Sequence, residues 1–228
     1  MELAAARWPE VAALGGACLL VVPVGSLEQH GPHLPLDTDT RIAVALARRL
    51  AADRSHMVVG PAVPFGASGE HADFPGTLLL GHDVLADVLM ELVRSARRSF
   101  TGVVVVSAHG GNHQGLAEVA RRCAHDGEDV VIWSTSVPGG DAHAGRTETS
   151  LLLAIDPGLV RLDLAEAGCT EPLASILPRL RAEGVRPVSS NGVLGDPEGA
   201  SAEEGRALLA ALAGELSAVV QARWPDVA

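Results

Sequence analysis

Short apolar runs alternate with amphipathic stretches along most of the chain, and this alternation constrains the fold more than any other feature. The runs are rich in Val, Ile and Leu, and they span residues 17–24, 57–63, 102–107 and 129–134. Continuous apolar strands are typical of a parallel sheet that is covered on both faces. The sequence therefore predicts a buried, mostly parallel sheet.

The segments between the runs carry apolar residues at helical spacing, with arginine on the remaining face. They predict helices over residues 40–54, 83–99 and 114–126, and two further helices are expected over 145–155 and 202–223. This strand and helix order implies right-handed crossovers that place helices on both sheet faces. We predict a single α/β domain over residues 1–228, a three-layer α/β/α sandwich. Residues 185–199 are expected to form a long surface or active-site loop.

The charge composition excludes several classes of function. The 228 residues include 17 basic and 28 acidic side chains, a net charge of −11, so no nucleic-acid partner is expected. All the basic residues are arginine, and the sequence contains neither lysine nor tyrosine. A lysine Schiff base, a phosphate-loop lysine and a phenolic general acid are therefore excluded. Catalysis must rest on His, Asp, Glu, Ser, Cys or a metal ion.

The cysteines and the N-terminus favour a cytoplasmic protein. Cys18, Cys123 and Cys169 are odd in number and far apart, which is typical of free thiols in a reducing compartment. The N-terminus lacks a basic region, and the apolar run at 17–24 is too short to span a bilayer. We therefore expect no signal peptide and no membrane partner.

Histidines gather after the predicted strands. Seven of the nine lie in the loops that follow them or just beyond: His30, His33, His71, His82, His109, His113 and His143. In parallel α/β sheets, ligands bind outside the carboxyl ends of the strands. The sequence therefore predicts a functional site at this edge of the sheet.

Four side chains of these loops form a candidate metal centre. Glu28 and His30 follow the first strand, Asp39 lies at the start of the next helix, and His109 follows the third strand. Two imidazoles and two carboxylates suit a pair of Zn²⁺, Fe²⁺ or Mn²⁺ ions about 3.5–4 Å apart, with Asp39 as the bridging carboxylate. The alternative is that Asp39 is only a helix N-cap and that His30 or His33 is only a turn residue.

The segment 22–39, VPVGSLEQHGPHLPLDTD, resembles the signature of the creatininase family of metal-dependent amidohydrolases. HGGN at 109–112 and HAGRTETS at 143–150 resemble its second and third motifs, in the same order and spacing. The resemblance implies a creatininase-like domain that holds two divalent metal ions. Glu28 and His109 would bind one ion, His30 would bind the second, and Asp39 would bridge them.

The chain departs from the family pattern in two places. Creatininase has a glutamate two residues after the histidine that matches His109, where this chain has Gly111. We expect Glu148 to replace this ligand, because the start of its helix lies next to the fourth-strand loop. The alternative is that Glu148 is only a favourable charge in a first helical turn. Ser107 and Ala108 replace the usual Asn-Gly, which is expected to alter the turn more than the chemistry.

The implied chemistry is amide hydrolysis, in which the metal ions activate a water molecule and polarise the carbonyl. His143 and Glu148 are the candidate catalytic residues. His143 would donate a proton to the departing nitrogen or a hydrogen bond to the tetrahedral intermediate. The alternative is a supporting or helix-capping histidine.

Further residues are expected around the metal centre. Glu70 and His71 are candidates for substrate contact or for support of the ligands, unless they only pack their loop. Gln29, Asp37 and Asn112 are candidates for positioning the ligands. Two cations near the same edge, Arg41 and Arg146, suit a peptide carboxylate unless they are simply solvated.

Within the family, further segments resemble the peptidases of mycofactocin biosynthesis: residues 37–43, 66–71, 141–143, 192–197 and 202–206. This resemblance implies a homo-oligomeric peptidase that releases the modified C-terminal Val-Tyr dipeptide from a precursor peptide. Hydrolysis of a small cyclic amide or a formamide is the enzymatic alternative, and a metal-stabilised protein without activity is the other. A serine or cysteine hydrolase is disfavoured, because no G-x-S-x-G segment is present and Cys18 lies inside a predicted strand.

Overall fold

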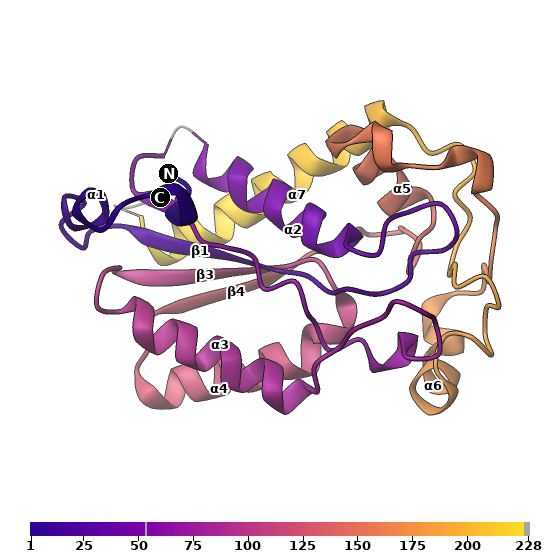
Figure 1. Cartoon of the computed structure of the whole chain (residues 1–228), viewed down its shortest axis with the longest axis horizontal. Helices are drawn as coiled ribbons and strands as arrows, with labels where there is room; N and C mark the ends of the chain where they lie inside the picture. Colours follow the sequence, from indigo (N-terminus) through magenta and orange to yellow (C-terminus); the bar gives the residue numbers. More distant parts are fainter. Residues whose placement is uncertain (53, 226–228) are drawn as a thin grey trace.

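The computed structural model describes residues 1–52 and 54–225, and a parallel sheet forms the middle of this part (Figure 1). Its order is β2-β1-β3-β4, with β1 at Leu19–Val24, β2 at Met57–Val59, β3 at Gly102–Ser107 and β4 at Val130–Ser134. Leu19 pairs with Met57 on one side and with Gly102 on the other. All residues of β1 and β3 are buried, as expected for central strands.

Helices cover both faces of the sheet (Figure 1). The elements α2 (Thr38–Ala51), α5 (Arg146–Ile155) and α7 (Ala202–Arg223) lie on one face, and α3 (His82–Ala96) and α4 (His113–Asp126) on the other. Leu19 and Val21 of β1 pack into the first core, and Leu20 and Val22 into the second. Alternate side chains of a strand point to opposite faces, so β1 contributes side chains to both cores. The predicted α/β sandwich with a parallel sheet is confirmed.

Several element bounds differ from the prediction. The second strand ends at Val59 instead of residue 63, because Gly60 and Pro61 follow and proline cannot donate a ladder hydrogen bond. The helix expected from residue 40 already begins at Thr38, with Asp37 at the N-cap, so Asp39 is not the cap. Asp53, inside the predicted range 40–54, lies outside the described residues.

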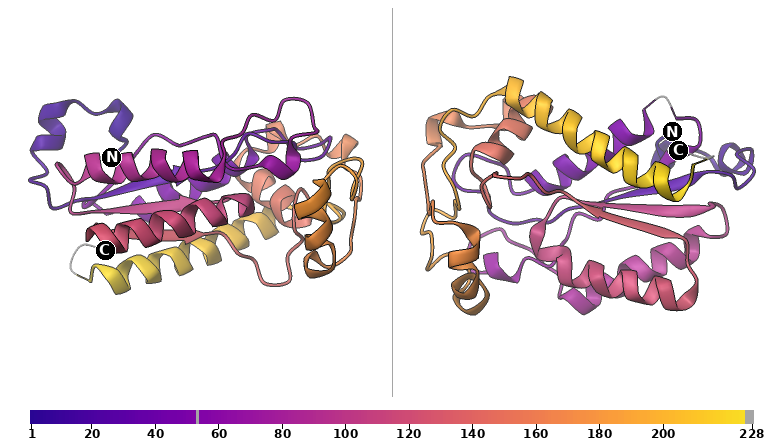
Figure 2. Two further views of the ribbon diagram at one scale, coloured as in Figure 1. Left: turned by 90° about the horizontal axis from the view of Figure 1, so that it is seen from below. Right: turned by 180° about the vertical axis from the view of Figure 1, so that it is seen from behind.

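Two short helices were not predicted, α1 (Trp8–Ala12) and α6 (Leu173–Glu183). An internal proline, Pro178, obscures the pattern of α6. Figure 2 shows α6 and the segments around it gathered at one end of the molecule, away from α1. There Ile176, Leu180, Val185 and Leu194 form a small separate core.

None of the helices within residues 1–52 and 54–225 is long and apolar enough to cross a bilayer. All three cysteines are free thiols, and Cys18 and Cys123 are buried.

Candidate functional site

Tight packing between the end of β1 and the start of α2 positions the first carboxylates. A Cβ on Gly25 would lie 2.5 Å from backbone atoms of Thr40, so only glycine lets the two elements approach this closely. Across this contact, the Ser26 hydroxyl donates a hydrogen bond to Asp39 Oδ2 at 2.5 Å. Asp39 in the first turn of α2 and Glu28 after β1 therefore face the same space, where both are buried.

His109 joins Glu28 and Asp39 in a first group of possible metal ligands. Its Nε2 lies 3.3 Å from Glu28 Oε2, and its Nδ1 lies 3.3 Å from Asp39 Oδ2. The three side chains are buried and offer ligand atoms within 4.8 Å of one another. Two loops that are far apart in sequence thus converge at the edge that the strand pattern indicated.

His30 lies on the other side of Asp39, in a second group with His143 and Glu148. His30 Nε2 is 3.3 Å from Asp39 Oδ1 and 3.9 Å from Glu148 Oε2. His143 Nδ1 is 4.0 Å from the same Glu148 oxygen. The two oxygens of Asp39 therefore face different histidines, so Asp39 is the carboxylate that could serve both groups of ligands.

Buried polar atoms without a hydrogen-bond partner indicate whether these residues could bind a metal ion. Both carboxylate oxygens of Glu28 and Nε2 of His109 are buried and have no hydrogen-bond partner among the described residues. Such groups are costly to bury, and burial raises the pKa of Glu28 to about 8 although His109 opposes the shift. Atoms that bind one ion tetrahedrally at about 2.0–2.3 Å lie about 3.3–3.7 Å apart. The donor chemistry, and the 3.3 Å between Glu28 Oε2 and His109 Nε2, fit a divalent metal ion.

Metal uptake is expected to be coupled to proton release. Burial lowers the pKa of both His30 and His109, but nearby carboxylates outweigh this effect. Asp39 has the largest opposing effect on His30 and Glu28 on His109, and both pKa values rise to about 10. An ion must displace these protons, and the free-energy cost of releasing each of them falls as the pH rises toward its pKa. We predict that metal affinity increases from about pH 6 to about pH 8, by about tenfold per pH unit for each proton released.

Isothermal titration calorimetry of the metal-free protein in buffers of different ionisation enthalpy would count these protons. A metal affinity that stays constant over this pH range would contradict the prediction.

His71 completes the cluster on the far side of Glu28. Its Nε2 lies 3.2 Å from Glu28 Oε1, and His143 Nδ1 lies 3.7 Å from the same oxygen. The His71 and His143 rings pack with centroids 4.5 Å apart. Burial and neighbouring histidines lower the pKa of His71 to about 3 and that of His143 well below its ordinary value. Both rings are therefore neutral near pH 7, and His143 must accept a proton before it can donate one.

Glu70 fills the space beside Gly111. A Cβ on Gly111 would lie 2.3 Å from His109 Nε2 and 2.6 Å from Glu70 Oε1. The Glu70 carboxylate is 3.7 Å from His109 Nε2, and its side chain is 30 % exposed. Glycine at position 111 thus admits a second, solvent-accessible carboxylate next to His109.

Asn112 holds the loops rather than facing the carboxylates. Its Oδ1 accepts a hydrogen bond from the Ala67 backbone at 2.8 Å, and its Nδ2 donates to the Gly25 carbonyl at 3.0 Å. The loops after β1, β2 and β3 are joined through this one side chain.

The two candidate arginines are engaged by other carboxylates. Arg41 of α2 pairs with the N-cap residue Asp37 at 2.7 Å, and Arg146 pairs with Glu204 at 2.8 Å. These contacts give no support to a role in binding a peptide carboxylate, and Asp37 is occupied by Arg41.

The loop that carries His143 depends on Asp141, a residue with no role predicted from the sequence. Its carboxylate accepts hydrogen bonds from the backbone of Arg146 and, at 2.9 Å, of Thr147, so it caps α5. Ala144 has a φ of 52°, and its N–H donates to Glu148 Oε2 at 2.6 Å. An aspartate shortly before a helix is an ordinary capping signal and could have been found. The positive φ of Ala144 has no sequence signal.

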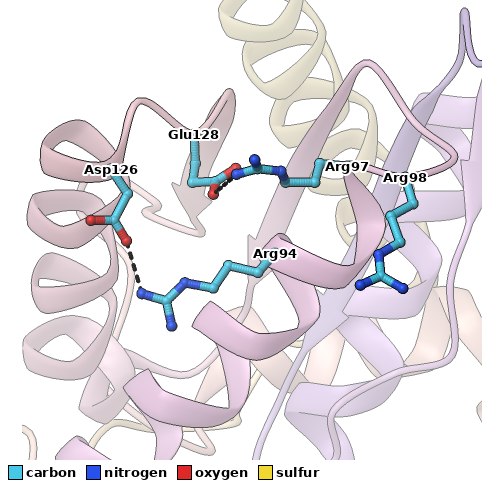
Figure 3. Close-up of a pocket in the computed structure, with 5 residues that line it drawn as sticks. All are labelled: Arg94, Arg97, Arg98, Asp126 and Glu128. Atoms are coloured by element: carbon cyan, nitrogen blue, oxygen red, sulfur yellow. Dashed lines mark hydrogen bonds and ion pairs between the residues drawn. The ribbon is translucent and has the colours of Figure 1, made fainter.

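A surface hollow elsewhere is lined by Arg94, Arg97, Arg98, Asp126 and Glu128 (Figure 3). It lies by the carboxyl ends of α3 and α4, at the opposite end of the sheet from the histidines. Arg94 pairs with Asp126 at 2.8 Å, and Arg97 with Glu128 at 2.6 Å. Most of its charge is compensated in this way, so the histidine and carboxylate cluster is the stronger candidate site.

Comparison with known proteins adds independent findings. The sequence profile of a family named Creatininase and described as creatinine amidohydrolase matches residues 4–220. The mycofactocin precursor peptide peptidase of Mycolicibacterium smegmatis is 46% identical over 214 residues, which cover 91% of this chain and 86% of the relative. The creatinine amidohydrolase of Pseudomonas putida is 27% identical, with 96% and 95% covered. A solved structure titled "Creatininase Mn" has a TM-score of 0.78 and 26% identity, and 98% of each chain is covered.

Proposed function

The chain belongs to the creatininase family, and from this premise we propose that it is a metal-dependent peptidase of mycofactocin biosynthesis. It would hydrolyse the amide bond that releases the modified C-terminal Val-Tyr dipeptide from the precursor peptide. Its similarity to a named peptidase of that precursor over most of both chains supports this substrate. The observation that carries the chemistry is the buried, unpaired Glu28 carboxylate between His71 and His109.

Two divalent metal ions complete this proposal. Glu28, Asp39 and His109 would hold one, and His30, Asp39 and Glu148 would hold the other. Imidazole and carboxylate donors support zinc, iron or manganese. When bound, the ions supply Lewis acidity that polarises the scissile carbonyl and makes water a stronger nucleophile near neutral pH.

The side chains around the ions supply proton transfer and orientation. His143 is neutral, and its Nδ1 faces Glu28 and Glu148, so it can take a proton at that atom and pass it to the departing nitrogen. Glu70 is the exposed carboxylate of the cluster, which supports its assignment to substrate contact. His71 supports Glu28 from the opposite side.

We propose that Glu148 replaces the metal ligand that is missing at position 111. The metal content of Glu148 variants tests this. We expect Glu148→Ala to bind about one ion per chain instead of two, measured by inductively coupled plasma mass spectrometry. Glu148→Gln can still accept the hydrogen bond from Ala144 but loses the charge, so it separates a ligand from a support of that turn. Two ions in both variants would remove Glu148 from the metal site.

The substrate is tested by incubating the protein with each metal in turn. The modified precursor peptide and creatinine are offered separately, and products are followed by mass spectrometry. We expect release of the C-terminal dipeptide and no hydrolysis of creatinine. Hydrolysis of creatinine alone would overturn the proposed substrate but not the amidohydrolase chemistry.

We also propose that the protein is a cytoplasmic homo-oligomer. An exposed apolar stripe on α3 supports assembly: Val84, Val88 and Leu92 recur at every fourth residue and are 51%, 37% and 39% exposed. Light scattering coupled to size-exclusion chromatography measures the mass directly.

A further inference from the structure

The orientation of the Gln29 side-chain amide is fixed by a backbone contact. Gln29 is 5% exposed, and its Oε1 lies 2.8 Å from the backbone nitrogen of Gly31. A backbone N–H can only donate, so the atom facing it must be the amide oxygen. The amide nitrogen of Gln29 is therefore the group that faces the histidines.

The amide nitrogen has two protons and three polar neighbours. It lies 3.0 Å from the Gly192 carbonyl, 2.9 Å from His71 Nδ1 and 3.1 Å from His143 Nε2. His143 Nε2 is also 2.8 Å from the backbone carbonyl of Gln29, which can only accept. His143 Nε2 therefore carries a proton itself and cannot accept another. The two amide protons go to Gly192 and to His71 Nδ1.

We propose that Gln29 is a positioning residue that fixes which ring nitrogen of His71 and of His143 carries the proton. His71 accepts at Nδ1, so its proton lies on Nε2, the atom 3.2 Å from Glu28 Oε1. His143 is also protonated on Nε2, but its bare Nδ1 is the atom that faces Glu28 and Glu148. The cluster thus receives an N–H from His71 and a lone pair from His143.

This assignment separates two histidines that otherwise look equivalent. Glu28, His71 and His143 lie closely enough together to hold an ion, yet a protonated Nε2 on His71 cannot bind one. His71 is left with an N–H on the side of Glu28, available to negative charge that develops on the substrate, and His143 is left with the proton-accepting nitrogen. Both rings are buried, which favours their neutral tautomers.

The loop at 185–199 packs closely against the side-chain amide of Gln29. A Cβ on Gly192 would lie 1.9 Å from Gln29 Oε1, and Gly192 has a φ of +82°. The neighbouring residue Leu194 forms a bridge with His143. The long loop predicted from the sequence therefore takes part in aligning the histidines through Gln29.

Nuclear magnetic resonance of the metal-free protein tests the proposal without any substrate. Ring ¹⁵N shifts of labelled histidine distinguish a protonated from a bare nitrogen, with peaks assigned by single His71→Gln and His143→Gln variants. We expect Nε2 protonation in both rings. A proton on His71 Nδ1, or on His143 Nδ1, would overturn the proposal.

The variant Gln29→Glu removes the donor at nearly constant shape. His71 Nδ1 is then expected to become protonated in order to donate to the new carboxylate. On the proposed function, kcat should fall about 10–100-fold, as is usual for partners that orient ligands, with KM changed less than twofold.

Gln114→Glu, the same change at an exposed site on α4, is the control and should alter neither ring nor rate. Unchanged His71 shifts in Gln29→Glu would refute the positioning role. If the spectra agree and no peptide is cleaved, the proposed function fails and the tautomer assignment stands.

Discussion

Replacing Glu28 by glutamine is expected to abolish amide hydrolysis and to leave the fold intact. The change keeps the shape of the side chain but removes the charge that lies 3.3 Å from His109 and 3.2 Å from His71. Loss of a partner that only orients a ligand costs about 10–100-fold, so loss of a ligand should lower kcat/KM by at least about 1,000-fold. Mass spectrometry of the metal content should show fewer ions per chain.

Thermal unfolding in a chelator separates this loss from misfolding. The pKa of Glu28 is raised to about 8 by burial, so the folded state holds a proton that the unfolded state releases at lower pH. The stability that comes from this proton is present below the ordinary pKa of a glutamate and is lost as the pH rises through about 8. Glutamine does not titrate, so the Glu28→Gln variant loses no stability in this way as the pH rises. The metal-free variant should therefore be at least as stable as the metal-free wild type at about pH 9.

Glu118→Gln serves as the control, because Glu118 is a surface residue of α4 that pairs with Arg121 and Arg122. It should retain activity and metal. Full activity in Glu28→Gln would refute the metal assignment, and a lower melting temperature at about pH 9 would refute the account of its buried charge.

The sheet was predictable because a strand that is buried on both faces is a continuous apolar run, and surface segments lack such runs. Gly102–Ser107 was predicted at its observed bounds, since all its residues are buried. Other boundaries were set by single residues, such as Pro61 after β2. The helix α6 was missed because it packs against loops instead of the sheet, and its internal Pro178 weakens the helical pattern.

The site was predictable to the extent that chain direction determines it. Residues that directly follow parallel strands must meet at one edge, and for this reason Glu28, His30 and His109 could be grouped from the sequence. Contacts set by side-chain packing could not be predicted. The hydrogen bond of Ser26 to Asp39 and the orientation of the Gln29 amide depend on tertiary distances that no spacing encodes.

Gly111→Ala is expected to disrupt the site by adding a single methyl group. The new Cβ would lie 2.3 Å from His109 Nε2 and 2.6 Å from the Ala67 carbonyl, which belongs to the backbone and cannot turn away. Overpacking of this kind costs about 1–3 kcal/mol of stability. Because His109 must move, we expect loss of metal and a fall in kcat/KM of at least about 100-fold.

Gly110→Ala is a closely matched control, since a Cβ on Gly110 meets nothing within 4 Å. It should keep the metal and change stability by less than about 1 kcal/mol. Equal effects of the two substitutions on metal content and unfolding would show that the contacts of a Cβ at position 111 are not the cause of the loss.

The same geometry explains why a glutamate cannot simply be restored at position 111. In Gly111→Glu, the side chain would start in space that the Glu70 carboxylate occupies, beside His109. The single variant should therefore lose metal as Gly111→Ala does. Adding Glu70→Gly frees only that space and leaves the contacts with His109 and the Ala67 carbonyl, so the double variant should lack metal as well. Recovery in the single variant would instead mean that Glu70 yields easily, and that glycine at 111 is not needed to admit its carboxylate.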